Sequence, residues 1–138
     1  FRSSAASYVY KRQVIEGCDS NGCEYMTGGT VVILGDVGDN FAAGMTGGMA
    51  FIYDKSQQFE KKVNPESVVW QNVETDYWKE YLKNLVSEHF KETESQLSKK
   101  IIENFDDEVN NFVQVCPKEM LDKLKNPITL KKDIKKVS

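Results

Sequence analysis

The chain has 138 residues, of which 40% are hydrophobic and 11% aromatic, and its net charge at pH 7 is −3. This composition is that of one domain with a modest core; it argues against intrinsic disorder and gives no general attraction to nucleic acid. The apolar runs are four or five residues long, too short to cross a bilayer. Three cysteines without a Cys-x-x-Cys pair predict reduced thiols rather than a disulfide framework or a zinc site.

Glycine divides the chain into two parts of different composition. All nine glycines lie between Gly17 and Gly48, and no lysine or arginine occurs from residue 13 to residue 54. From Lys55 onward the chain has no glycine and is rich in charged residues and asparagine, as helical and solvated segments are. We therefore expect two structural parts with a junction in residues 55–75.

The glycine-rich part contains an internal repeat. Met-Thr-Gly-Gly begins at residue 26 and again at residue 45, each time before an apolar, strand-like run. Residues 14–17 resemble the end of an earlier copy. Short strands and glycine corners at this spacing predict the last coils of a β-solenoid, in which each coil buries its inward side chains against the next.

The same glycines raise the alternative of a phosphate-binding loop. A dinucleotide cradle needs Gly-x-Gly-x-x-Gly between a strand and a helix, whereas Gly35-x-x-Gly38 and Gly44-x-x-Gly47 have other spacings, and a strand-like run follows Gly48. No P-loop sequence occurs, and the basic partner that a phosphate would need is missing from residues 13–54. We therefore expect these glycines to turn corners by adopting positive φ.

The second part shows helical periodicity. A polar connector over residues 58–62 leads to an extended segment, residues 67–73, expected to cover the open end of the solenoid. Thr75 or Asp76 can cap a helix, a second helix is predicted over residues 95–104, and a third, opened by Pro117, over residues 118–125. A short extended segment over residues 112–116 lies between them. The apolar residues of the helices are Trp78, Tyr81, Leu82, Leu85, Val86, Phe90, then Leu97, Ile101, Ile102, then Met120, Leu121 and Leu124.

A few single residues could suggest chemistry, but each has a structural explanation. Cys23 has no histidine within the first 88 residues to activate it, so a buried structural thiol is expected. His89, the only histidine, is expected to be a packing or edge residue, because partners for a metal are not found. Glu24, Asp36 and Asp39 lack a calcium-loop pattern and are expected to be solvated. We therefore predict no catalytic, cofactor-binding or metal-binding residue.

Several motifs closely resemble one family. They are Gly-Cys-Glu-Tyr-Met-Thr-Gly-Gly at residues 22–29, Val-Val-Ile-Leu-Gly at residues 31–35, Asn-Phe-Ala-Ala-Gly-Met at residues 40–45 and Val-Asn-Pro-Glu at residues 63–66. Together they resemble the carboxy-terminal domain of the glutamate synthase large subunit, over residues 14–125. The resemblance implies a mainly β fold, a right-handed parallel β-helix of which only the last coils are present, followed by an α-helical tail.

The resemblance also implies a role in a larger enzyme. That enzyme transfers the amide nitrogen of glutamine to 2-oxoglutarate, with electrons from NADPH, NADH or ferredoxin passing through FMN and an iron–sulfur cluster. The chemistry is expected in the upstream amidotransferase and FMN-binding domains, which the β-helix braces, with a small subunit or ferredoxin as a further partner. This fragment alone is expected to be inactive, and its compartment the cytoplasm or a plastid.

The resemblance leaves alternatives and boundaries to test. A second hypothesis is an independent β-helix subunit of another oxidoreductase, similar to a formylmethanofuran dehydrogenase subunit, and a nucleotide-binding module is a third. Residues 1–13 fit no coil and resemble translated adapter sequence, so we expect a non-native leader there. The predicted organisation is coils and a closing strand over residues 14–74, a helical tail over residues 75–125 and a basic, frayed end over residues 126–138.

Overall fold

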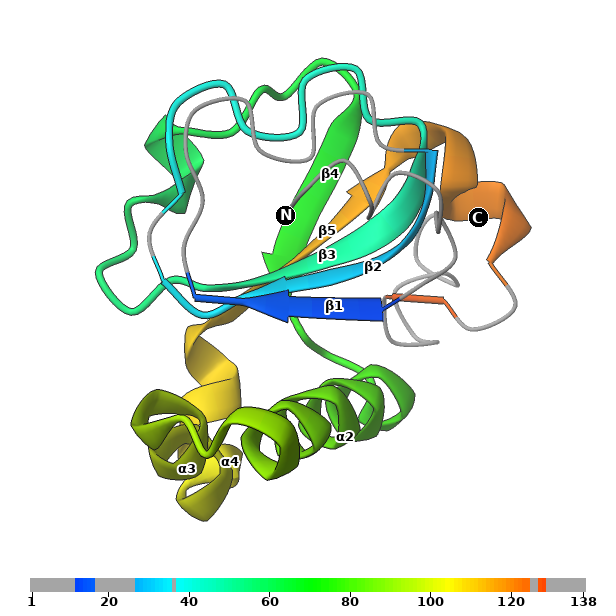
Figure 1. Cartoon of the computed structure of the whole chain (residues 1–138). Coiled ribbons are helices and arrows are strands. Elements are labelled where there is room, and N and C mark those ends of the chain that lie inside the picture. The colour runs from blue at the N-terminus through cyan, green and yellow to red at the C-terminus, as the bar shows by residue number, and fades with distance from the viewer. Residues whose placement is uncertain (1–11, 17–26, 36, 125–126, 129–138) are drawn as a thin grey trace.

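The architecture is a five-stranded mixed sheet with helices packed on one face and turns on the other (Figure 1). The computed structural model describes residues 12–16, 27–35, 37–124 and 127–128. The strand order is β1-β2-β3-β5-β4, so the last strand in sequence lies inside the sheet rather than at its edge. None of the helices in the described residues has the length and apolar character needed to cross a membrane.

Three parallel strands form the glycine-rich part of the sheet: β1 (Arg12–Ile15), β2 (Thr27–Ile33) and β3 (Gly47–Tyr53). Val14 pairs with Val32, and Val32 pairs with Phe51, which gives offsets of 18 and 19 residues. The register therefore confirms the internal repeat and places Val14 and Ile15 in an earlier copy, while Gly17 lies outside the described residues. Strand β1 begins two residues before the predicted start of the coils, because backbone pairing does not require an apolar side chain.

The glycine pairs lie inside strands rather than at corners, contrary to prediction. Gly29 has φ 81° and Gly48 has φ 85°, and both fall within β2 and β3. The register shifts by one residue between Thr27 and Thr30, opposite the second glycine pair. A residue with positive φ at such a bulge changes the direction of the strand without ending it. Glycine adopts positive φ at little steric cost.

The corner between β2 and β3 is turned largely by other residues. Gly44 (φ 66°) and Ala42 (φ 67°) are both left-handed, and the Met45 amide donates to the Ala42 carbonyl at 3.1 Å. Phe41, Ala42 and Met45 are fully buried. Positive φ at an alanine is costly, so Ala42 is a left-handed residue that the sequence did not predict.

This corner is stacked on the connector that follows β3. Phe41 forms a parallel bridge with Val63, and the Asn64 side-chain amide donates to Asn40 Oδ1 at 2.8 Å. The predicted polar connector is wrong at one position, since Phe59, in the 3-10 helix η1 (Phe59–Lys61), is only 2% exposed. Its ring packs against Phe41 with centroids 5.5 Å apart, which places an aromatic pair inside the stacked turns.

Both extended segments predicted in the second part are strands, but their order differs from expectation. Strand β5 (Phe112–Pro117) pairs antiparallel with β3 on one side and with β4 (Val68–Asn72) on the other. Strand β3 is therefore covered by β5, and β4 lies one position further out. Period-two patterning identifies a strand but does not specify its neighbour, so the sequence could not decide this order.

Two of the three predicted helices are α-helices, and the third is not. Helix α2 (Asp76–Thr93) is capped by Thr75, whose hydroxyl accepts from the Trp78 amide at 3.4 Å, and α3 (Gln96–Glu103) is capped by Ser95. Two short elements that were not predicted follow, α4 (Phe105–Glu108) and the 3-10 helix η2 (Val109–Asn111). The predicted third helix is instead the 3-10 helix η3 (Lys118–Lys123), and Pro117 is the last residue of β5.

The alternating side chains of the sheet enter two separate cores. The helix-face core lies between the sheet and helices α2–α4, and the coil-face core lies between the sheet and the stacked turns (Figure 1). Each fully buried aliphatic or aromatic side chain contributes about 1.5–3 kcal/mol. The helix-face core includes Val32, Phe51, Leu82, Val86, Ile101 and Phe112; the coil-face core includes Ile33, Phe41, Met45, Ile52, Phe59 and Val115.

Candidate functional site

His89 lies at the edge of the helix layer, as expected for this residue. Its Nε2 is 3.1 Å from Glu16 Oε2, at the end of β1, and the histidine side chain is 12% exposed. Hydrogen bonds from Ser95 and His89 hold the pKa of Glu16 below its ordinary value. The pair therefore ties the end of α2 to the end of β1.

The other residues that could suggest chemistry are not brought together in the described part of the chain. Cys23, Glu24 and Asp36 lie outside the described residues, and Asp39 is exposed. Cys116 is buried in the helix-face core, and burial raises the pKa of its thiol to about 11. A thiol in this state is a packing group rather than a nucleophile.

A buried polar network that the sequence did not predict joins β3 to α4. The Tyr53 hydroxyl donates to Glu108 Oε1 at 2.6 Å, and Asn111 Nδ2 donates to the same oxygen at 3.1 Å. The bond from Tyr53 holds the pKa of Glu108 below its ordinary value, while burial and the carboxylate raise the pKa of Tyr53. No spacing rule connects residues 55 positions apart, so no sequence signal could have found the pair.

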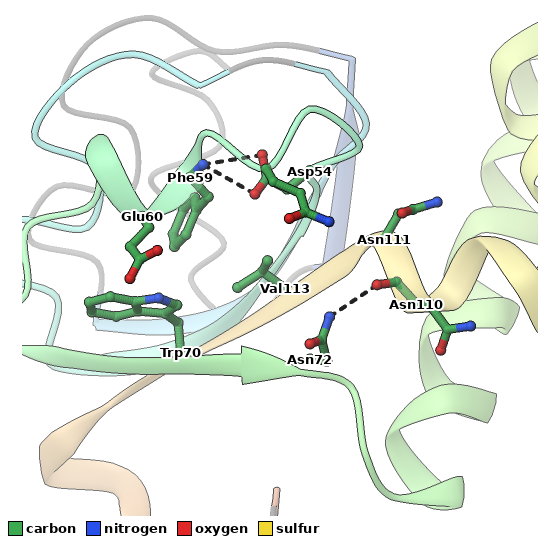
Figure 2. Close-up of a pocket in the computed structure, with 9 residues that line it drawn as sticks. Asp54, Phe59, Glu60, Trp70, Asn72, Asn110, Asn111 and Val113 are labelled. Carbon is green, nitrogen blue, oxygen red and sulfur yellow. Dashed lines mark hydrogen bonds between the residues drawn. The ribbon is translucent and has the colours of Figure 1, made fainter.

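A polar pocket of about 270 Å³ opens beside this network (Figure 2). Its walls come from the end of β3 and η1 on one side and from β4, η2 and β5 on the other. Figure 2 shows the Trp70 indole and the Glu60 carboxylate together at one end, with Asn72, Asn110 and Asn111 at the other. The pocket is lined by Asp54, Gln57, Phe59, Glu60, Trp70, Asn72, Asn110, Asn111 and Val113.

Several polar atoms of the pocket already have partners. Both oxygens of Asp54 accept from the Phe59 amide, at 3.1 and 3.2 Å, and so cap η1. Asn72 Nδ2 donates to the backbone carbonyls of Asn110 and Phe112, at 3.0 and 3.2 Å. These bonds hold the loops that form the walls of the pocket. The side-chain oxygen of Asn72 takes no part in them.

The described residues offer no ligand set for the iron–sulfur cluster that the resemblance implies. An iron–sulfur cluster needs several cysteine thiolates, and Cys116 is a buried thiol. No group of three or more His, Cys, Asp or Glu side chains that could hold a metal ion occurs among the residues described.

Comparison with known proteins gives a consistent family. The model of the GXGXG motif family matches residues 4–118, which includes part of the expected leader. The chain is 54% identical over 121 residues to the NADPH glutamate synthase large chain of Azospirillum brasilense, an alignment that covers 88% of this chain and 8% of that protein. It is 40% identical to the NADH glutamate synthase of Schizosaccharomyces pombe, over 90% of this chain and 6% of that one.

A relative from a plant is named for a third electron donor, ferredoxin. The chain is 45% identical to the chloroplastic ferredoxin-dependent glutamate synthase of Spinacia oleracea, over 75% of this chain and 6% of that protein. The chain spans less than a tenth of the length of these curated relatives. The chain belongs to the GXGXG motif family, and over most of its length its relatives are glutamate synthase large chains.

Proposed function

We propose that this chain is the carboxy-terminal structural domain of a glutamate synthase large chain. The complete enzyme would form glutamate from glutamine and 2-oxoglutarate with NADPH, NADH or ferredoxin as donor, in the cytoplasm or a plastid. The observation that carries the proposal is the identity of 40–54% to glutamate synthases over about nine-tenths of this chain. The relatives' names include all three donors, so the donor is left open.

The structural role is supported by where the polar side chains are used. Tyr53, Glu108 and Asn111 bond to one another and join the sheet to the helices, and Asp54 caps η1. These groups stabilise the fold, because the hydrogen bonds that they make are to other residues of this domain. We propose that the catalytic groups belong to other domains of the same long chain, which this domain holds in position.

The fold also supports a place within a longer β-helix. The parallel register at offsets of 18 and 19 residues, together with the Phe41–Val63 bridge between successive turns, is the arrangement of stacked coils. Strand β1 is at the edge of the described sheet. We propose that β1–β3 are the last coils of a right-handed β-helix, with the preceding coil pairing along β1.

The proposal can be tested in a complete enzyme. The homologous segment of the Azospirillum brasilense large chain would be replaced by this chain, and glutamine-dependent glutamate formation would be measured with NADPH. We expect the chimera to keep activity and a chimera without the segment to lose it. Loss of activity in a folded chimera of native size would contradict membership of this enzyme.

The non-catalytic role has its own readout in the same chimera. Tyr53→Phe should lower the thermal stability and leave kcat unchanged at a temperature where the variant is folded. A large fall in kcat with unchanged stability would mean that this network takes part in the chemistry.

A further inference from the structure

The pocket of Figure 2 presents hydrogen-bond acceptors and an aromatic face, with no positive charge. Asn72 donates its amide NH2 group to two backbone carbonyls within the fold, so its side-chain oxygen is the atom left for a ligand. The Glu60 carboxylate is exposed and makes no ion pair with a described residue. No lysine or arginine lines the pocket. The ligand that fits such a lining carries several N–H donors and a positive charge.

The Trp70 indole in the pocket wall favours one kind of cation over another. The Trp70 indole is half-buried and held against Phe59, with ring centroids 6.2 Å apart and planes at 75°. This edge-to-face contact holds the indole in place, and Figure 2 shows the Glu60 carboxylate beside the same ring. A planar guanidinium stacks on an indole and bonds in a fork to a carboxylate, whereas an ammonium does neither as well.

We propose that this pocket receives an arginine side chain from another domain of the same long polypeptide. The guanidinium would stack on Trp70 and pair with Glu60, which lie together at one end of the pocket. The inference rests on the proposed function, because the relatives are more than ten times longer than this chain and a bracing domain must contact the domains that it holds. The charge complementarity supports a cationic occupant, and the length of the relatives supports a source within one chain.

The chemistry of the pocket is tested first on the 138-residue chain itself. N-acetyl-arginine-amide is titrated while the Trp70 indole N–H is followed by NMR. We expect saturable shifts with the arginine probe and none with the neutral citrulline analogue, which has nearly the same shape. Trp78, on the helix face, is the internal reference and should not shift. Equal responses to both probes, or none to either, would overturn the proposal.

A matched pair of variants tests the carboxylate. Glu60→Gln removes the charge at the pocket and should raise the dissociation constant of the arginine probe about threefold to fivefold, the size of a charge or cation–π contact at a partly exposed site. Glu66→Gln removes an exposed charge outside the pocket and should leave it unchanged. Equal effects of the two variants would mean a non-specific attraction to negative charge.

The source of the arginine is tested in the chimera described above. A photoreactive benzoylphenylalanine is placed at the exposed pocket residue Asn110, with position 66 as control, and cross-linked peptides are identified by mass spectrometry. We expect a cross-link from position 110 to an arginine-bearing peptide of the same polypeptide. A cross-link to a second copy or to the small subunit, or none, would contradict the intrachain source.

The two tests separate this proposal from the proposed function. An inactive chimera would refute the proposed function, while the titration of the 138-residue chain would still decide whether the pocket prefers a guanidinium. An active chimera without the arginine response would refute the pocket alone.

Discussion

The two faces of the sheet are built by different means from the same strands. On the helix face, Val32 and Phe51 pack against the amphipathic helix α2, whose stripe is evident in the sequence. On the coil face, Ile33 and Ile52 pack against turns that carry Phe41 and Phe59. The helix face therefore depends on periodicity along one element, and the coil face depends on the stacking of successive turns. The two tryptophans report on them separately, Trp78 on the helix face and Trp70 on the coil face.

Truncating one large side chain on each face is the strongest test of this difference. Phe41→Ala and Phe51→Ala both remove a fully buried ring, and each should lower the free energy of unfolding by about 3–5 kcal/mol. Urea unfolding followed by fluorescence of the two tryptophans measures the effect, with Trp70→Phe and Trp78→Phe backgrounds to separate the signals.

The shared strands predict one cooperative transition for both faces. In either variant the Trp70 and Trp78 signals should change at the same urea concentration. Separate midpoints, with the Trp70 signal lost first in Phe41→Ala, would mean that the stacked turns unfold independently of the helix face.

The second test concerns the network that crosses from the sheet to the helices. Tyr53→Phe leaves the Glu108 carboxylate with one donor fewer in a buried site, and should cost about 1–3 kcal/mol at pH 7. Because the pKa of Glu108 is lowered in the folded chain, its contribution is present above the ordinary value of 4.5 and is lost as the pH falls through the lowered one. The pKa of Tyr53 is raised, so its contribution is present below 10.0 and is lost at higher pH.

This prediction is checked by measuring the free energy of unfolding of the native chain and of Tyr53→Phe from pH 3 to pH 8. The difference between them should shrink toward pH 3, and Glu108→Gln should flatten the acid limb. A difference that does not depend on pH would mean that the Tyr53 hydroxyl stabilises the fold by something other than its bond to the ionised Glu108 carboxylate.

The features that the sequence could predict are local ones, and the features that it could not predict depend on contacts between distant segments. The repeat, the helix α2 with its Thr75 cap and the two later strands are local patterns, and the structure confirms them. The insertion of β5 between β3 and β4 depends on pairing between distant segments, which patterning does not encode. The pocket depends on the same pairing, because it brings Asp54, Trp70 and Asn111 together from three regions of the chain. Its residues could not be found from the sequence alone.

A smaller effect is expected at the glycine that shapes β3. Gly48 has φ 85°, so Gly48→Ala forces a Cβ into the left-handed region and should cost about 1–2 kcal/mol. Gly38 does not adopt a positive φ, so Gly38→Ala is the matched control, expected to change stability by less than about 0.5 kcal/mol. Thermal unfolding of the two variants measures both values. Equal costs would mean that position 48 tolerates a Cβ, so the positive φ of Gly48 would not explain the glycine.

The smallest effect is expected at the contact between α2 and β1. The Glu16 carboxylate is 47% exposed, so its attraction to His89 is screened, and His89→Ala should cost no more than about 1 kcal/mol. The loss should be smaller in 1 M salt than at low ionic strength, because salt screens the attraction of an exposed carboxylate. Glu16→Gln should reproduce the salt dependence if the carboxylate is responsible. A larger, salt-independent cost would instead mean that the imidazole acts through packing at the edge of the helix-face core.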